Sequence, residues 1–146
     1  MQPPVIIYRI SRFFYDLKIK PISWLFDYSN RLFFKCWIPG SARIGKNFTV
    51  GYWGIGVIIH SNTIIGDNCQ VNQNTTIGKK ITTNGVPKLG NNVYIGANCV
   101  IYGAISIGDH AVIGPLSLVN TNIPANTFAA GVPAKPIKEN SSSKDT

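Results

Sequence analysis

Apolar residues recur with two different periods along the 146-residue chain. In the first 37 residues they follow the spacing of one helix face, in two successive sets. The two sets are Ile6, Ile7, Ile10, Phe13, Phe14 and Leu17, and then Ile22, Leu25, Phe26, Ser29, Leu32 and Phe33. The second set begins near Pro21, which suits a first helical turn, and ends before Trp37. The pattern predicts two amphipathic helices that pack as a cap on the rest of the protein.

From Ile38 onward an aliphatic residue recurs every six positions and is often followed by glycine. In most repeats a small residue stands four places after the aliphatic residue. The aliphatic positions are Ile38, Ile44, Val50, Ile59, Ile65, Val71, Ile77, Leu89, Ile95, Ile101, Ile107, Ile113 and Val119. This period fits neither a helix nor an alternating strand. Six residues can form one short strand and its turn, so three repeats close a triangular coil. The segment has room for about four stacked coils.

This repeat resembles that of the hexapeptide-repeat acyltransferases over residues 38–138. The most specific match is the closing segment Ala130-Gly131-Val132-Pro133-Ala134-Lys135-Pro136-Ile137, which is similar to that of the serine acetyltransferase and sugar O-acetyltransferase branch. The resemblance implies an all-β fold, a left-handed parallel β-helix, here with a short N-terminal helical cap. It also implies a homotrimer that uses acetyl-CoA and needs no metal. We therefore expect helices in residues 1–37, the β-helix in 38–138 and a flexible tail in 139–146.

Two interruptions of the six-residue period mark the expected site, because repeat proteins often carry insertions on their working face. The first places Tyr52 and Trp53 in a glycine-rich stretch between Val50 and Ile59. The second is a polar segment from Lys79 to Lys88. We expect both to border one cleft, in which Tyr52 and Trp53 support a sugar ring. Lys79 and Lys80 would meet a diphosphate or an anionic lipid.

His60 follows Ile59, where most repeats have glycine, so it is the candidate catalytic base. Acetyl transfer to an alcohol needs a group that takes the hydroxyl proton, and imidazole titrates near a pH of about 6.5. The resembling sugar-modifying enzymes often show a stretch like Gly56-Val57-Ile58-Ile59-His60. The alternative is a turn histidine on a solvated corner, which is also the expected role of His110.

The resemblance assigns coenzyme A to small residues whose bare backbone can approach the pantetheine arm, with one lysine for the phosphates. They are Gly96, Ala97, Gly114, Ala130, Gly131 and Lys135. The glycines also serve the repeat itself, so a purely structural role stays open for each of them.

Two departures from the serine acetyltransferase pattern bear on the acceptor. That family has Asp-His where this chain has Tyr52-Trp53, and His-Pro-Lys where it has Val86-Pro87-Lys88. The expected function is therefore acetyl-CoA-dependent O-acetylation of a sugar hydroxyl, on a polysaccharide, a lipid-linked glycan or a nucleotide sugar. The alternatives are a serine O-acetyltransferase-like enzyme and a non-catalytic β-helix scaffold. Two histidines are too few for the three-histidine zinc site of a carbonic anhydrase on this fold.

The net charge of +8 is concentrated at one end, because the first 46 residues hold eight basic and two acidic side chains. No nucleic-acid-binding motif accompanies them, so the basic helices favour peripheral contact with an anionic membrane over nucleic acid. Arg9, Arg12 and Asp16 interrupt the first apolar stretch too early for a signal peptide or a membrane span. Three widely spaced cysteines predict no disulfide and a cytoplasmic protein, at most peripheral at the inner membrane face.

Overall fold

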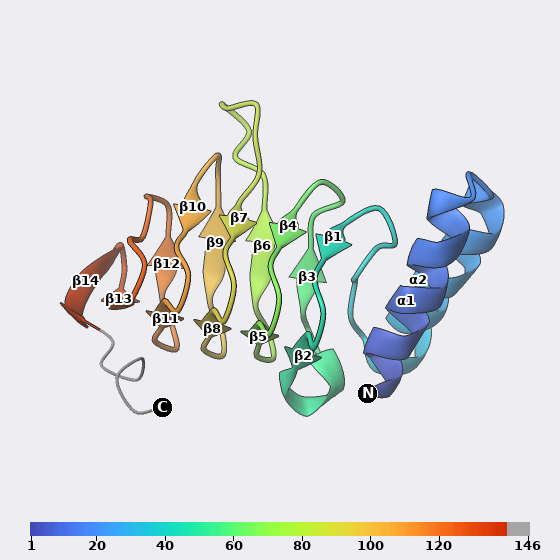
Figure 1. Cartoon of the computed structure of the whole chain (residues 1–146), viewed down its shortest axis with the longest axis horizontal. Coiled ribbons are helices and arrows are strands. Elements are labelled where there is room, and N and C mark those ends of the chain that lie inside the picture. The colour runs from blue at the N-terminus through green and yellow to red at the C-terminus, as the bar shows by residue number, and fades with distance from the viewer. Residues whose placement is uncertain (140–146) are drawn as a thin grey trace.

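The computed structural model describes residues 1–139 as two helices followed by stacked short strands. Helix α1 spans Pro3–Asp16 and helix α2 spans Lys20–Phe34, in agreement with the helical periodicity. Each coil of the chain passes through three sheets in turn, which we call A, B and C (Figure 1). The predicted tail begins at Glu139, which ends the last strand; residues 140–146 lie outside the described residues.

The strands of each sheet are contributed by successive coils. Sheet A contains β3 (Ile58–Ile59), β6 (Thr76–Gly78), β9 (Val100–Tyr102) and β12 (Leu118–Val119). Sheet B contains β1 (Arg43–Ile44), β4 (Ile64–Ile65), β7 (Lys88–Leu89) and β10 (Ser106–Ile107). Sheet C contains β2 (Thr49–Val50), β5 (Gln70–Val71), β8 (Tyr94–Ile95), β11 (Val112–Ile113), β13 (Thr127–Gly131) and β14 (Ala134–Glu139).

Neighbouring strands are parallel except for β13 and β14, which form an antiparallel hairpin. The register places each aliphatic repeat residue on its equivalent in the next coil, as with Ile59, Ile77 and Ile101 in sheet A. Sheets A and B hold four strands each, so the chain makes about four coils. The predicted parallel β-helix of hexapeptide repeats with an N-terminal helical cap is thus confirmed.

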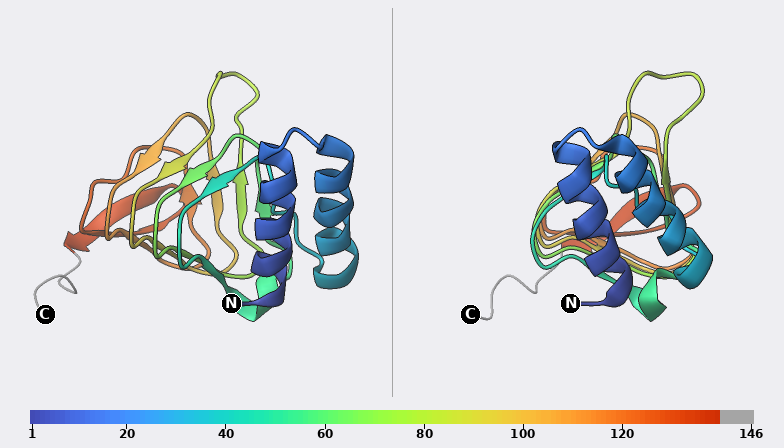
Figure 2. Two further views of the ribbon diagram at one scale, coloured as in Figure 1. Left: turned by 45° about the vertical axis from the view of Figure 1, so that its right-hand side comes forward. Right: turned by 90° about the vertical axis from the view of Figure 1, so that its right-hand side faces the viewer.

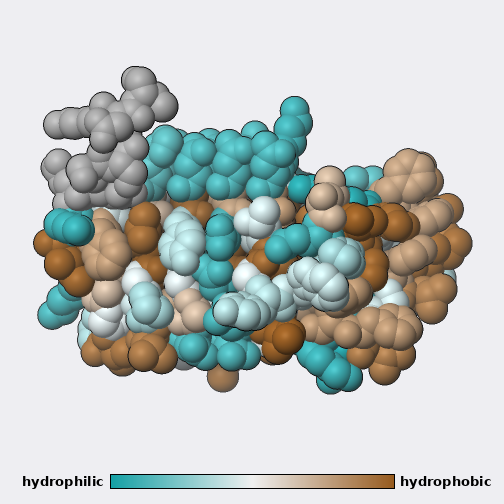
Figure 3. Space-filling view, turned by 90° about the horizontal axis from the view of Figure 1, so that it is seen from below, coloured by the Kyte–Doolittle hydropathy of each residue, from teal (hydrophilic) through white to brown (hydrophobic). Residues whose placement is uncertain are grey.

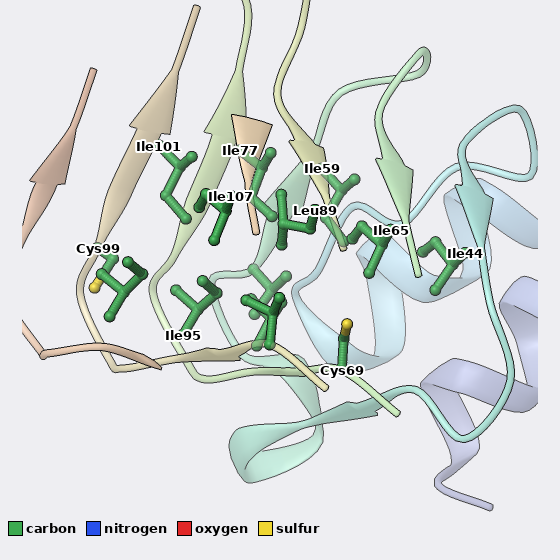
Figure 4. Close-up of a cluster of buried hydrophobic side chains, with 14 of the residues drawn as sticks. Ile44, Ile59, Ile65, Cys69, Ile77, Leu89, Ile95, Cys99, Ile101 and Ile107 are labelled. Atoms are coloured by element: carbon green, nitrogen blue, oxygen red, sulfur yellow. The ribbon is translucent and has the colours of Figure 1, made fainter. Parts of the chain in front are cut away.

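The core of the coil consists of the repeat residues that the period identifies. All thirteen aliphatic positions are at most 7% exposed, and Figure 4 shows several of them pointing into the coil. The small residues four places later, including Cys69 and Cys99, are buried as well. One buried Ile, Leu or Val per strand stabilises the fold by about 1.5–3 kcal/mol relative to an exposed side chain.

Helix α1 closes the open edge of the first coil with polar side chains. The Tyr8 hydroxyl donates a hydrogen bond to the Ala42 carbonyl at 2.8 Å. The Gln2 amide pairs with both backbone groups of Val50 at 2.8 Å. Arg9 donates to carbonyl groups of the same coil. These contacts satisfy backbone groups that no preceding coil could reach.

The two helices pack on the first coil as predicted, but many of their large apolar side chains stay exposed. Leu25 and Phe33 of α2 are 66% and 71% exposed, and Phe13 and Leu17 of α1 are also exposed. The residues that α2 buries are polar instead, because α1 presents polar side chains to it. Figure 2 shows both helices side by side across the end of the coil.

Candidate active-site edges

The sequence-predicted site residues lie on the two edges that bound sheet A. We call the turns from sheet C to sheet A the lower edge, and the turns from sheet A to sheet B the upper edge, after their places in Figure 1. The first insertion contains the short helix η1 (Gly51–Gly54) and lies on the lower edge. The second, residues 79–87, projects from the upper edge. The prediction that both border one cleft is therefore wrong within a single chain.

The lower edge carries the residues predicted to bind coenzyme A. Gly96 and Gly114 occupy equivalent places in successive coils, and Ala130 follows in the next. A Cβ on Gly114 would stand 2.9 Å from the Ala130 Cβ, and one on Gly96 would stand 2.6 Å from the Pro115 nitrogen. Coil stacking alone therefore accounts for both glycines. The same lack of side chains also leaves the backbone of this edge accessible to a ligand.

Ala97, Gly131 and Lys135 extend this column of small residues. Ala97 is half-buried in the turn after Gly96, and the Gly131 N–H donates to the Ser117 hydroxyl at 3.3 Å. Lys135 is exposed and lies opposite Ala130 in the hairpin of β13 and β14. The structure therefore brings the six predicted coenzyme-binding residues together at the end of the lower edge that lies farthest from the helical cap.

Tyr52 and Trp53 lie on the same edge, in the first coil. Both adopt left-handed backbone conformations, with φ of 48° and 54°. This conformation is uncommon for bulky residues, and strain of this kind often accompanies a functional site. The two side chains are 77% and 55% exposed, and the Trp53 ring contacts Phe34 edge-on with centroids 6.0 Å apart. The pair therefore presents an aromatic surface at the capped end of the lower edge.

His60 lies on the upper edge, directly after β3. The Asn62 N–H donates a hydrogen bond to Nδ1 of His60 at 3.2 Å. In the neutral imidazole the proton then resides on Nε2, so Nε2 is a donor in this conformer. A proton could be accepted at Nε2 only in the other tautomer, in which the Asn62 N–H loses its acceptor. Asn62 was not singled out by the sequence, although its position two residues after His60 is that of a turn partner.

Lys79 and Lys80 are exposed at the start of the upper insertion. Lys79 lines a cavity of about 610 Å³ beneath this loop, together with Asn62, Lys88 and Asn122. The repeat pattern alone gave no signal for Asn122, because the cavity forms only where turns of different coils meet. Amide and ammonium donors line this space on one part and Val86, Ala104 and Ile105 on another, so it suits an anionic or hydroxyl-rich ligand that also has an apolar face.

The three thiols are buried inside the coil or beneath the cap. Cys36, Cys69 and Cys99 are free and buried. Burial raises the pKa of the Cys36 thiol to about 11 and also raises the pKa of the other two, so they carry little thiolate. Among residues 1–139, no group of three or more His, Cys, Asp or Glu side chains is arranged to hold a metal ion.

Comparisons with known proteins agree with this architecture. Residues 87–121 match the family model described as bacterial transferase hexapeptide (six repeats). The Escherichia coli K12 protein WcaB, described as a putative colanic acid biosynthesis acetyltransferase, is 30% identical over 141 residues, and the match covers 90% of this chain and 86% of that protein. The galactoside O-acetyltransferase of the same strain is 35% identical over 109 residues, which cover 66% of this chain and 53% of that enzyme.

The solved structures that superpose on this chain include serine acetyltransferases. The crystal structure of the Brucella abortus S19 enzyme in complex with coenzyme A superposes with a TM-score of 0.88 at 26% identity, and covers 92% of this chain and 54% of that one. The chain spans about half the length of the serine acetyltransferases that it matches. The resemblance inferred from the repeat and from the closing segment is confirmed.

Proposed function

The chain belongs to the bacterial hexapeptide-repeat transferases, and we propose that it is an acetyl-CoA-dependent O-acetyltransferase acting on a sugar hydroxyl. The acetyltransferase class is supported by relatives with different acceptors. The finer choice of a sugar rests on one observation. The aromatic pair Tyr52 and Trp53 stands on the same edge as the column of small residues. At the position of this pair, the serine acetyltransferase pattern has Asp-His instead.

The lower edge would hold the donor. Backbone groups beside Gly96, Gly114 and Ala130 can hydrogen-bond the pantetheine arm, and Lys135 can meet a phosphate as a point charge. Tyr52 and Trp53 would stack on the apolar face of the acceptor sugar, because an aromatic ring offers a large and rigid contact surface. Donor and acceptor would then approach along one edge of the coil.

His60 can reach this edge only from another subunit, since it lies across sheet A. The outer surface of sheet A is the apolar one, with Ile58 and Val100 48% and 42% exposed. Sheet B instead exposes the charged residues Arg43 and Lys88. In a homotrimer with sheet A turned inward, the upper edge of each subunit would meet the lower edge of the next. Such head-to-tail contacts close into a ring of three equal sites.

In each shared site His60 would accept the proton of the acceptor hydroxyl as the oxygen attacks the thioester carbonyl. The C–S bond then breaks and the coenzyme thiolate takes the proton. Backbone N–H groups of the turns can stabilise the oxyanion. Before Nε2 can accept a proton, the hydrogen bond from the Asn62 N–H to Nδ1 must break, which costs about 1 kcal/mol of free energy. Lys79 and Lys80 would hold a phosphate of the acceptor's carrier.

The direct test measures coenzyme A release from acetyl-CoA with a panel of glycans and with L-serine. We expect turnover with a sugar acceptor, and a Trp53→Ala variant that raises the KM for the sugar with little change for acetyl-CoA. Turnover with L-serine alone would instead support the serine acetyltransferase alternative, which the structural likeness favours. Absence of coenzyme A binding in calorimetry would favour the non-catalytic scaffold.

A second test addresses the shared site. We expect His60→Ala and Ala97→Trp to be inactive alone, because each damages a different edge, the second by placing a large side chain at the half-buried turn after Gly96. When the two chains are co-expressed with different tags, mixed trimers contain one intact site each, so about a quarter of the wild-type activity should return. No recovery in verified mixed trimers would show that each site lies within one chain. Unchanged turnover in His60→Ala would remove His60 from the mechanism.

A further inference from the structure

Helix α2 buries a polar face and exposes an apolar one. Ser23, Asp27 and Asn30 are at most 4% exposed, and they lie against α1 and the first coil. The Ser11 hydroxyl of α1 donates to Asp27 Oδ1 at 2.6 Å, and the Gly40 N–H donates to the same oxygen at 2.9 Å. An amphipathic helix that faced only water would have the opposite orientation.

The outward side of both helices is correspondingly rich in large apolar residues. Leu25, Leu32 and Phe33 are 66%, 64% and 71% exposed. Figure 3 shows hydrophobic side chains gathered at the helical end of the molecule. We call the following exposed residues the cap surface: Ile6, Ile10, Phe13, Leu17, Ile22, Trp24, Leu25, Tyr28, Leu32 and Phe33. A patch of this kind is unusual on a protein surface without a partner.

The charges beside the cap surface have one sign. Lys18, Lys20, Arg31 and Lys35 are exposed in the same two helices and their ends. Arg12 pairs with Asp16 at 2.8 Å, and the other carboxylate of the two helices is the buried Asp27. Exposed cations therefore flank the apolar side chains, and neither helix has an exposed carboxylate outside that pair.

We propose that the cap surface rests on an anionic lipid bilayer. Neither helix in the described part of the chain is long and apolar enough to cross a membrane. Helices with an apolar face and flanking cations lie in the plane of the interface instead, with the apolar side chains among the acyl chains and the cations at the headgroups. Trp24 and Tyr28 have the amphipathic rings that favour this level.

Charge distinguishes a lipid surface from a second copy of the chain. Two cap surfaces packed face to face would gather the cations of both copies, Lys18, Lys20, Arg31 and Lys35, around one interface without unpaired exposed carboxylates of the helices, and like charges repel. An anionic membrane offers both the apolar medium and the opposite charge.

The position of the cap determines the orientation of the molecule on the membrane. Both helices cover one end of the coil, so the stack of coils would project away from the lipid (Figures 1 and 2). If the proposed trimer forms with parallel coils, its three caps face the same way and bind together, which multiplies the affinity. This last step rests on the proposed function; the binding of a single cap does not.

Flotation of the full chain with vesicles of phosphatidylcholine, with and without phosphatidylglycerol, tests the proposal. We expect binding to the anionic vesicles that weakens with added salt, and little binding to pure phosphatidylcholine. A Leu25→Glu, Phe33→Glu double variant should lose binding at least tenfold. Its matched control is Ile81→Glu with Val132→Glu, which changes two exposed apolar residues outside the cap by the same charge. The control should lose much less binding.

A second pair of variants isolates the electrostatic contribution. Lys18→Ala with Lys20→Ala should weaken binding about fivefold for each cation removed. Lys46→Ala with Lys88→Ala, which removes two exposed cations of the coil, should have a smaller effect. The fluorescence of Trp24 should shift to the blue with anionic vesicles, and Trp24→Phe should abolish most of that shift.

Three results would overturn the proposal. The first is no flotation with anionic vesicles, and the second is an equal loss of binding in the cap double variant and its matched control. The third is a particle of twice the trimer mass that does not bind vesicles and that is halved in mass only by the cap variant. The last would mean that a second copy covers the surface. Acetyl transfer to a water-soluble acceptor should be unchanged in the cap variants. Failure of the membrane proposal is thereby distinguished from failure of the proposed function.

Discussion

In the coil, the buried residues are aliphatic side chains repeated every six positions, whereas the interface between α1 and α2 is built around Ser11, Ser23 and Asp27. The coil therefore gains stability from apolar burial that each turn supplies to its neighbours. The cap is positioned largely by hydrogen bonds, with the buried Val5 and Tyr8 and the stacked rings of Phe14 and Phe26, and it leaves many large apolar side chains exposed. The difference indicates that the coil is complete without a partner for its core, while the cap has a surface available for one.

The two ends of the coil differ in a similar way. At the first coil, the backbone edge is closed by the side chain of Gln2, which precedes α1, and by side chains of α1, including Tyr8 and Arg9. At the other end of sheet C, it is closed by the backbone of β14, which pairs antiparallel with β13. Side-chain closure depends on a few residues, so single substitutions should weaken the helical end selectively.

The largest difference between the two regions is expected for removal of an apolar side chain. Ile101→Ala, in the core of the coil, should lower the free energy of unfolding by about 2–5 kcal/mol, because the site is fully buried. Leu25→Ala, on the cap surface, should change it by less than about 0.5 kcal/mol. Urea unfolding at one fixed protein concentration measures both. Similar losses would show that the cap surface is covered by protein in solution.

Polar closure of the first coil should respond to a smaller change. Tyr8→Phe removes the hydroxyl that donates to the Ala42 carbonyl and accepts from the Ile44 N–H at 3.1 Å. The Ile44 N–H then lacks its acceptor, and the Ala42 carbonyl keeps only the longer contact from Arg12 at 3.4 Å, so we expect a loss of about 1–3 kcal/mol. The control is Tyr94→Phe, whose ring is 41% exposed on sheet C. Equal effects of the two variants would contradict the role assigned to α1.

The six-residue period was enough to predict the coil, because every repeat residue meets the same environment. It also identified Ile44 and Ile101 as core positions. The separation of the two insertions could have been found by counting strands in threes, since Val50 falls in sheet C and Ile77 in sheet A. Proximity along the stack does not determine which edge a turn occupies.

The orientation of the helices could not be predicted in the same way. A helical period shows which residues share a face, and it leaves open whether that face turns inward. The polar residues Ser23, Asp27 and Asn30 also share a face. The hydrogen-bond donors for Asp27, the Ser11 hydroxyl and the Gly40 N–H, come from other segments and meet it only in the folded chain. The lone Asn62 contact to His60 is likewise a property of the folded turn.

The smallest expected effect concerns the charge at the centre of the cap. Burial raises the pKa of Asp27, against the opposing effect of the hydrogen bonds from Ser11 and Gly40. A carboxyl group with a raised folded-state pKa binds its proton more tightly in the folded state. Its contribution to stability is therefore fully present below the unfolded value of about 3.9 and is lost as the pH rises through the folded pKa. The coil core has no buried carboxylate among its repeat positions and should show no such dependence.

Asp27→Asn keeps an oxygen for the Ser11 and Gly40 donors but carries no charge. Thermal unfolding of the variant and the wild type across the acid range should give curves that differ in slope, with the wild type losing stability relative to the variant as the pH rises. Ile113→Val, in the fully buried core of the coil, changes no titratable group and is the control, so its difference from the wild type should stay constant across the acid range. Parallel curves for Asp27→Asn and the wild type would mean that the hydrogen bonds fully offset the burial of the carboxylate. The polar interior of the cap would then carry no free-energy cost from the buried charge.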